Sequence, residues 1–369
     1  MVAKSGSLFL TRTDAEATHM YRWTLGNGWE DLGVLLGGHD VEAVCIQGSY
    51  LYIAGSFTML MPGNTYATNI AKFNYVTDTW SPVGDGSFDS TIYAVAVDSN
   101  GKVYIGAEDT GGNHGANLVT GLFKYWNGSA WATLGSGMYG RSAGIYGRAM
   151  INGLVADGTD IYAVGHFDAG VNGDSSRVNS TNIIKWDGSS WHAMGTPTGY
   201  GIVVGLTSEP DFRKIAVSGT NVFVTGGFKN DDGNGGVIPP MGLDRFSVNC
   251  SHVQAFSLLD GFQGNATYGL DVSARNGIVY LAGGFNYIDS TAVTGVAQWS
   301  GSSWSALGSG VDASCDAAAA DLDTCLPGNY VFVLGEFTHA GGQTVSNPAY
   351  PYPVPISWIP GTTGPECNE

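Results

Sequence analysis

The sequence of 369 residues predicts an all-β fold, a seven-bladed β-propeller of four-stranded antiparallel blades. Three observations support this prediction. A short run of β-branched, aromatic and aliphatic residues that ends in glycine recurs seven times along the chain. Two aromatic columns follow these copies and contain all 10 tryptophans. Gly is frequent, at 56 residues, and charged residues make up only 13%, which favours short strands and tight turns over helices.

The repeated strand is most regular at residues 279–285, which read VYLAGGF. Clear copies lie at 51–57, 161–167, 222–228 and 331–337, and weaker ones at 103–109 and 8–11. The aromatic second position falls at residues 9, 52, 104, 162, 223, 280 and 332, so neighbouring copies are 43 to 61 residues apart. A repeat of this period over the whole chain indicates one repeat domain rather than two separate domains.

Each copy is the second strand of an expected four-stranded unit. A first strand precedes it, as at 41–46, 92–97, 212–217 and 267–272, and a short turn joins the two into a hairpin. The third strand follows a polar loop and ends in an aromatic: Trp23, Phe73, Trp126, Trp186, Phe246, Trp299 or Trp358. The fourth strand begins with a residue of the second column: Trp29, Trp80, Trp131, Trp191, Val253 or Trp304. Because aromatic side chains bury a large area, we interpret both columns as structural residues that hold successive sheets together.

The units cover residues 1–33, 40–84, 91–135, 150–195, 211–257, 266–308 and 315–361, with a tail at 362–369, so that 1–369 form a single domain. The first and last repeats look incomplete at the seam. Only Met1–Gly6 precede the second strand of the first unit, and no Trp-x-x-Leu-Gly segment follows the third strand of the seventh. We therefore expect the ring to close imperfectly, or to take a strand from a neighbouring chain or a missing segment.

Three segments carry a resemblance to a known repeat: LYIAGSFT at 51–58, NIIKWDGSSW at 182–191 and WSALGSG at 304–310. They resemble the kelch-like propeller repeats of the galactose-oxidase central-domain type. The resemblance extends over essentially the whole chain and implies a propeller of the kind found in many secreted and cell-surface proteins. It implies little about activity, because propellers host many unrelated functions.

The formal net charge of −17 argues against nucleic acid as a partner, since phosphate binding needs a basic surface. The same charge fits an extracellular or cell-surface protein and permits divalent cations. No apolar run is long enough to cross a membrane, so we expect no membrane insertion. Residues 1–10 lack a basic segment followed by a long apolar core, so no signal peptide is visible in them.

The long loops are expected on one face of the ring. Because strand direction alternates within a blade, the loops between second and third strands open on the same side as the links between blades. The long loops between second and third strands are 58–68, 109–120, 168–181, 229–241 and 338–354. Binding residues concentrate on variable loops held by a rigid scaffold, so this face is the predicted binding surface. The candidate contacts are Asp109, His114, Tyr139, Arg141, Tyr146, Asp168, Asp174, Tyr200, Asp231 and Asp232.

Metal binding and catalysis have weaker support in the sequence. Asp168, Asn172 and Asp174 offer oxygen ligands that suit Ca²⁺, yet the spacing is not that of an EF-hand, and such clusters are ordinary turn chemistry. The seven histidines show no ligand spacing, and there is no Gly-x-Ser-x-Gly elbow or phosphate loop. We therefore predict no cofactor and no catalytic residue, with calcium as the alternative ligand. An enzymatic function would instead require a pair of carboxylates from different blades that meet at the ring centre.

The five cysteines are odd in number, so at least one is unpaired or bridges to another chain. We expect a disulfide between Cys325 and Cys367, which should lie on the same face of the seventh blade, whereas Cys315 and Cys325 would be separated by a strand. Cys45 is expected as a small buried residue. Glycosylation sequons occur at Asn127, Asn179, Asn249 and Asn265, and Asn127 lies in a tight turn.

These observations favour a non-enzymatic extracellular propeller, a structural, adhesion or protein-interaction module. It would bind a protein partner, or assemble with itself, through the long loops of one face or the open seam. The first alternative is a carbohydrate-binding, lectin-like propeller, in which Tyr139, Tyr146 or Tyr200 would stack on sugars. The second is a secreted hydrolase or oxidase with its site at the central channel.

Overall fold

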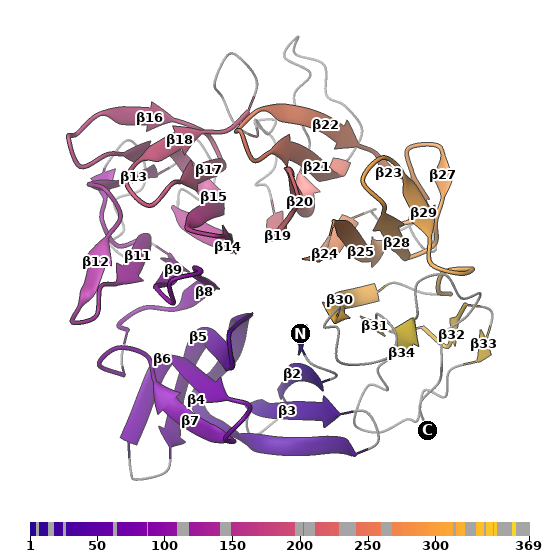
Figure 1. Cartoon of the computed structure of the whole chain (residues 1–369), viewed down its shortest axis with the longest axis horizontal. Helices are drawn as coiled ribbons and strands as arrows, with labels where there is room; N and C mark the ends of the chain where they lie inside the picture. Colours follow the sequence, from indigo (N-terminus) through magenta and orange to yellow (C-terminus); the bar gives the residue numbers. More distant parts are fainter. Residues whose placement is uncertain are drawn as a thin grey trace.

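The structure, a computed structural model, forms a ring of seven antiparallel β-blades around a central channel (Figure 1). It describes residues 1–4, 7–13, 18–24, 27–61, 65–86, 88–108, 118–140, 149–195, 202, 211–228, 241–259, 268–275, 277–312, 315–321, 330–335, 337–341, 343–344 and 356–358. These residues form strands and turns, and none of them belongs to a helix that could span a membrane. The prediction of a seven-bladed, all-β propeller is confirmed.

Blades one and two share a long strand. Blade one contains β1 (Val2–Lys4), β2 (Ser7–Thr13), β3 (Thr18–Thr24) and the first part of β4 (Gly28–Gln47). The remainder of β4 forms blade two with β5 (Tyr50–Met61), β6 (Thr65–Asn74) and β7 (Thr79–Pro82). Strand β4 thus crosses from the outer edge of one blade to the channel side of the next, where two register shifts mark the crossing.

The next four blades each have four antiparallel strands. Blade three contains β8 (Ile92–Val97), β9 (Val103–Ala107), β11 (Phe123–Trp126) and β12 (Trp131–Thr133). Blade four contains β14 (Met150–Asp157), β15 (Asp160–Val171), β17 (Ile183–Trp186) and β18 (Trp191–Ala193). Blade five contains β19 (Asp211–Ser218), β20 (Asn221–Phe228), β21 (Met241–Ser247) and β22 (His252–Phe256). Blade six contains β24 (Tyr268–Arg275), β25 (Ile278–Gly284), β28 (Val296–Trp299) and β29 (Trp304–Ala306).

The seam differs from its sequence prediction in the first blade. Strand β1 pairs antiparallel with β2, with Ala3 opposite Leu8, so blade one has four strands. The expectation of an incomplete first repeat was wrong, because a three-residue strand is enough to line the channel. Blade seven has β30 (Cys315–Asp321), β31 (Tyr330–Gly335) and β34 (Ile356–Trp358) among the described residues. Residues 359–369, in which no fourth strand was expected, lie outside them.

The repeated second strand is buried on both sides because it lies between two neighbouring blades. In β25, Val279 and Leu281 join an apolar cluster with Phe223 of blade five. The alternate residues, Tyr280 and Ala282, join a different cluster with Val331 and Val333 of blade seven. Successive side chains of a strand point to opposite faces, so one strand supplies two separate cores. This double burial explains why the repeat reads as a continuous apolar run.

The two aromatic columns face each other across the hairpin of strands three and four. Trp186 lies directly opposite Trp191, with ring centroids 5.0 Å apart, and Trp299 lies opposite Trp304 at 5.5 Å. Trp191 also contacts Phe123 of blade three, at 5.4 Å between ring centroids. Its side chain is 2% exposed. The interpretation of these columns as structural contacts within and between blades is confirmed for these pairs.

Candidate binding face and central channel

The hairpins between second and third strands and the links between blades emerge on one side of the ring, here called the hairpin face. The described links do not run free across it; those that enter blades two, six and seven pair with the hairpin of the blade that they enter. Leu36 pairs with Thr58 in blade two, and β23 (Leu258–Leu259) pairs with β26 (Tyr287–Ile288) in blade six. Val311 bridges to β32 (His339–Ala340) in blade seven. Segments predicted as variable loops are therefore partly hydrogen-bonded β-structure.

The largest of these additions joins blades three and four. Strand β13 (Gly137–Gly140), in the link, pairs with β10 (Leu118–Val119) and with the end of β15, which also pairs with β16 (Arg177–Asn179). Tyr139 lies in β13 opposite Leu118. The Arg177 guanidinium lies 4.3 Å from the centroid of the Tyr139 ring, and its Nε donates a 2.7 Å hydrogen bond to Asn179 Oδ1.

The structure places three further residues of the predicted site on the same extension. Asp168 lies in β15, where the register shifts against β13. Asn172 Oδ1 accepts a 2.7 Å hydrogen bond from the Trp191 amide. Asp174 Oδ1 accepts hydrogen bonds from the Ser176 amide, at 2.9 Å, and hydroxyl, at 2.6 Å. The bonds from Ser176 lower the pKa of Asp174.

The Asp174 and Asn172 oxygens proposed as calcium ligands therefore hold a turn and the start of β18. In the described part of the chain, no three or more His, Cys, Asp or Glu side chains are grouped as a metal site. The other predicted contacts lie outside the described residues: Asp109, His114, Arg141, Tyr146, Tyr200, Asp231 and Asp232.

The hairpin face also exposes large apolar side chains that the sequence reasoning did not single out. Tyr66 is 58% exposed, Leu118 43%, Leu259 38% and Tyr287 40%. Leu259 and Tyr287 are paired on adjacent strands, β23 and β26, while the next pair, Leu258 and Ile288, is buried. In the sequence, the signal for these side chains was an apolar residue within a segment that we had interpreted as a polar loop.

The opposite face has short turns closed by their own side chains. Asn127 Oδ1 accepts hydrogen bonds from the amides of Ser129 and Ala130, each 2.9 Å long, between β11 and β12. Such an Asx turn stabilises a tight connection without extending from the sheet. The sequon residues Asn127, Asn179 and Asn249 are exposed, and Asn265 lies outside the described residues.

Two cysteines have described side chains, and neither forms a disulfide. Cys250 lies after β21, and Cys45 lies on β4, where burial raises the pKa of its thiol to about 12. The predicted partners Cys325 and Cys367 lie outside the described residues.

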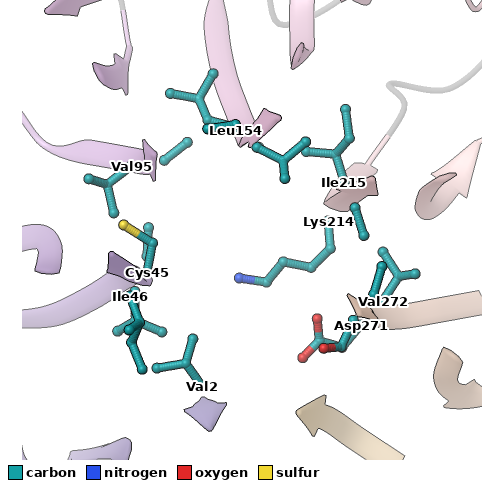
Figure 2. Close-up of a pocket in the computed structure, with 18 of the residues that line it drawn as sticks. Val2, Cys45, Ile46, Val95, Leu154, Lys214, Ile215, Asp271 and Val272 are labelled. Carbon is teal, nitrogen blue, oxygen red and sulfur yellow. The ribbon is translucent and has the colours of Figure 1, made fainter. Parts of the chain in front are cut away.

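The innermost strands β1, β4, β8, β14, β19 and β24 line a central cavity of about 540 Å³. Figure 2 shows Val2, Cys45, Val95, Leu154 and Val272 around the opening, and polar residues such as Gln47 and Ser273 also line the cavity. Lys214 reaches from β19 into the open centre, and Asp271 lies beside it on β24 (Figure 2). Of the described carboxylates, only Asp271 lines the cavity, so no described pair of carboxylates converges there.

A β-bulge recurs in the innermost strand near the hairpin-face end of the channel. In blade four the extra residue is Asn152, between Ile151 and Gly153, and the corresponding residues of blades two, three and five are Glu42, Tyr93 and Arg213. A bulge inserts one residue and bends the strand. A Cβ on Gly165 of the repeated strand would collide with the Met150 carbonyl oxygen beside this bulge. The glycine of the repeated strand therefore makes room for the bend of the innermost strand.

No protein-family model and no curated protein matches the chain. Several solved structures are similar to this chain. One is PorZ, a bacterial surface component of the type-IX secretion system of Porphyromonas gingivalis, with a TM-score of 0.47, 12% identity and coverage of 94% of this chain and 47% of that one.

A second match is the β-propeller domain of the Trilobed protease from Pyrococcus furiosus, described as having an open velcro topology. Its TM-score is 0.44 with 9% identity, and the match covers 80% of this chain and 76% of that one. A third is the computationally designed Ika8 protein, with a TM-score of 0.38, 12% identity and coverage of 90% and 94%. By its own strand topology, the chain is a seven-bladed, all-β propeller.

Proposed function

We propose that this chain is a non-enzymatic binding module that engages a protein partner through its hairpin face, at the cell surface or outside the cell. The observation that carries the proposal is the position of its exposed apolar side chains. Four of the six large apolar side chains exposed in the described part of the chain, Tyr66, Leu118, Leu259 and Tyr287, lie on this face. Aromatic side chains are enriched among the residues that dominate protein–protein binding energy.

The construction of the face also suits binding. The pairing of Leu258 with Ile288 anchors the exposed Leu259–Tyr287 pair to a buried pair of the same two strands. A surface that is already ordered loses little conformational entropy when a partner binds, so more of the contact energy appears as affinity. The opposite face offers mainly tight, self-satisfied turns, such as the one closed by Asn127.

Site-specific photo-crosslinking tests this proposal. A benzoylphenylalanine placed at Tyr66 or Tyr287 is expected to crosslink one protein species on intact cells of the source, and one at Val76, which is 70% exposed on the opposite face, is not. With the partner purified, Tyr287→Ala should weaken binding at least about tenfold, and Val76→Ala should leave it unchanged. Equal crosslinking from both faces, or from neither, would remove the support for this surface. Recovery of the chain only from the cytoplasmic fraction would contradict the proposed location.

Sugar binding is the second candidate function, because the Tyr66 and Tyr287 rings are exposed on the same face. Tyr139 suits this role less well, since the Arg177 guanidinium already covers its ring. A glycan array should then show binding that Tyr66→Ala or Tyr287→Ala abolishes and Val76→Ala preserves. An array with no bound glycan would count against this candidate and leave the protein-binding proposal to the crosslinking result.

A further inference from the structure

The hairpin of blade six carries two exposed apolar side chains on a hydrogen-bonded ladder. Leu259 of β23 lies opposite Tyr287 of β26, and their side chains are 38% and 40% exposed. The next pair, Leu258 and Ile288, is buried, because successive side chains of a strand point to opposite faces. The exposed pair therefore lies on the outer side of a small sheet, whose third strand is β27 (Thr291–Ala292).

An exposed carboxylate continues the same ladder. The Asp289 amide donates a 2.8 Å hydrogen bond to the Ser257 carbonyl oxygen, and Asp289 Oδ1 accepts one of 2.8 Å from the Ser257 amide. One step beyond the buried pair, the alternation brings Asp289 back to the outer side, where Leu259 and Tyr287 lie. Asp289 is exposed, and its Oδ2 has no partner among the described residues. Leu259, Tyr287 and Asp289, here called the blade-six patch, thus combine an apolar surface with an available carboxylate oxygen.

The segments around the blade-six patch contain no lysine or arginine. They are the described parts of the hairpin and of the two links beside it, 257–259, 285–295 and 307–312. Arg245 of the preceding blade contacts Phe256, next to the first of these segments, with its guanidinium 5.9 Å from the ring centroid. The same guanidinium lies closer to the Trp299 ring, at 4.9 Å. In the described part of the chain, no lysine or arginine forms an ion pair with Asp289.

The charges of the opposite face are arranged differently. There the Asp78 carboxylate pairs with Arg22, and Asp160 pairs with Lys185, each at 2.6 Å. Asp312, an exposed carboxylate of the link that leaves blade six, instead accepts a hydrogen bond from the Thr338 hydroxyl. The hairpin side of blade six therefore keeps negative charge that a cationic partner can approach.

We propose that the partner of the hairpin face is a protein with a basic surface, which places a lysine or arginine on Asp289 and an apolar side chain on Leu259 and Tyr287. This inference rests on the protein-binding role proposed above and adds the chemistry of the partner. An arginine at this position also gains from the Tyr287 ring, because a cation is attracted to an aromatic face. The formal net charge of −17 acts in the same direction, since it attracts a basic partner before contact.

Photo-crosslinking with a charge readout tests the chemistry of the partner. Benzoylphenylalanine at Leu259 leaves Tyr287 and Asp289 in place and is expected to crosslink a protein on intact cells of the source. Raising NaCl from about 50 mM to about 300 mM at constant osmolarity should lower the yield at least about threefold. The crosslinked peptide of the partner, sequenced by mass spectrometry, should contain lysine or arginine. A protein captured equally at both salt concentrations would overturn this inference and leave the hairpin face as a binding surface. No crosslink from Leu259, Tyr66 or Tyr287 would remove that surface and this inference with it.

Two variants with the same change in net charge locate the contact. Asp289→Asn keeps an oxygen for the Ser257 amide and suits the φ of +51° at this position, so the turn should persist. It should bind the crosslinked protein, once purified, at least about threefold more weakly. Asp157→Asn, at an exposed carboxylate on the opposite face, should bind like the unmodified chain.

Near-ultraviolet circular dichroism checks the fold of both variants. Equal weakening by Asp289→Asn and Asp157→Asn would reduce the effect to net charge and overturn the contact at Asp289. Unchanged binding by a folded Asp289→Asn variant would overturn it as well. If that variant does not fold, Asp289→Gly takes its place, because glycine also adopts a positive φ readily.

Discussion

Trp23 of the first blade and Phe332 of the seventh pack edge to face, with ring centroids 5.7 Å apart and ring planes at 69°. Phe332 is 1% exposed and belongs to the same buried cluster as Leu8, Leu10 and Tyr21 of blade one. Among the described residues, blades one and seven have no strand in common. The seam of the ring is therefore held there by side-chain packing.

Replacing Phe332 by Ala should test how much this packing contributes. Removing a buried Phe side chain typically costs about 3–5 kcal/mol, so we expect a loss of about 3 kcal/mol in the free energy of unfolding. Equilibrium urea denaturation measures it, with Val76→Ala as a control at an exposed site, expected to change the free energy by less than about 0.5 kcal/mol. A loss below about 1 kcal/mol would mean that other contacts close the ring.

Two glycines with similar φ angles allow the cost of a steric clash to be measured separately from the cost of backbone strain. Gly135 has φ +56° and Gly158 has φ +62°. A Cβ on Gly135 would collide with the Val171 carbonyl oxygen, whereas one on Gly158 meets nothing within 4 Å. Both Ala variants carry the strain of a positive φ, about 1 kcal/mol, but Gly135→Ala should lose at least about 1 kcal/mol more. Equal losses in thermal and urea unfolding would show that the close approach of Val171 is easily relieved.

The stability of blade five should depend on pH through a buried pair. His252 Nε2 lies 2.8 Å from Asp244 Oδ1, and this bond raises the pKa of His252, while burial raises the pKa of Asp244. A histidine with a raised pKa in the folded state adds stability that is complete below about pH 6.5 and is lost as the pH rises through its folded pKa. The raised pKa of Asp244 acts in the same direction, because the folded state keeps that proton to a higher pH than the unfolded state.

The unmodified chain should therefore have a larger free energy of unfolding than the His252→Gln variant. We expect this difference to decrease as the pH rises from about 6 to about 9. His192→Gln is the matched control, because its imidazole occupies the same strand of blade four, pairs with Asp187 and is 47% exposed. Its difference from the unmodified chain should vary less with pH. A titration by NMR that finds His252 at or below its ordinary pKa would contradict this prediction.

Cys45 should be unreactive in the folded protein despite lying on the channel wall. Burial raises the pKa of its thiol to about 12, so the thiol stays protonated near neutral pH and is a poor nucleophile. Alkylation with iodoacetamide, followed by peptide mapping, should modify Cys45 only after denaturation. Rapid labelling of the native chain at this residue would show that water enters the channel freely enough to ionise the thiol.

Much of the architecture follows from the sequence alone because it is local. The run at 279–285 identifies a buried strand, its seven copies set the number of blades, and the aromatic columns mark strands three and four. Trp186 and Trp191 are five residues apart, so a single tight turn brings them together whatever the rest of the chain does. A pattern of this kind needs no knowledge of distant contacts.

The candidate sites required the tertiary structure for the opposite reason. The channel wall combines residues from strands as far apart as β1 and β24, and no local pattern distinguishes Lys214 from a surface lysine. The bulge that adds Asn152 is set by pairing with β15, and β1 gains its place in blade one only by pairing with β2. The sequence by itself determined how many blades form and which residues hold each one together. The meeting of those blades in space decided what faces the channel and how the ring closes, because burial and charge there depend on neighbours from every part of the chain.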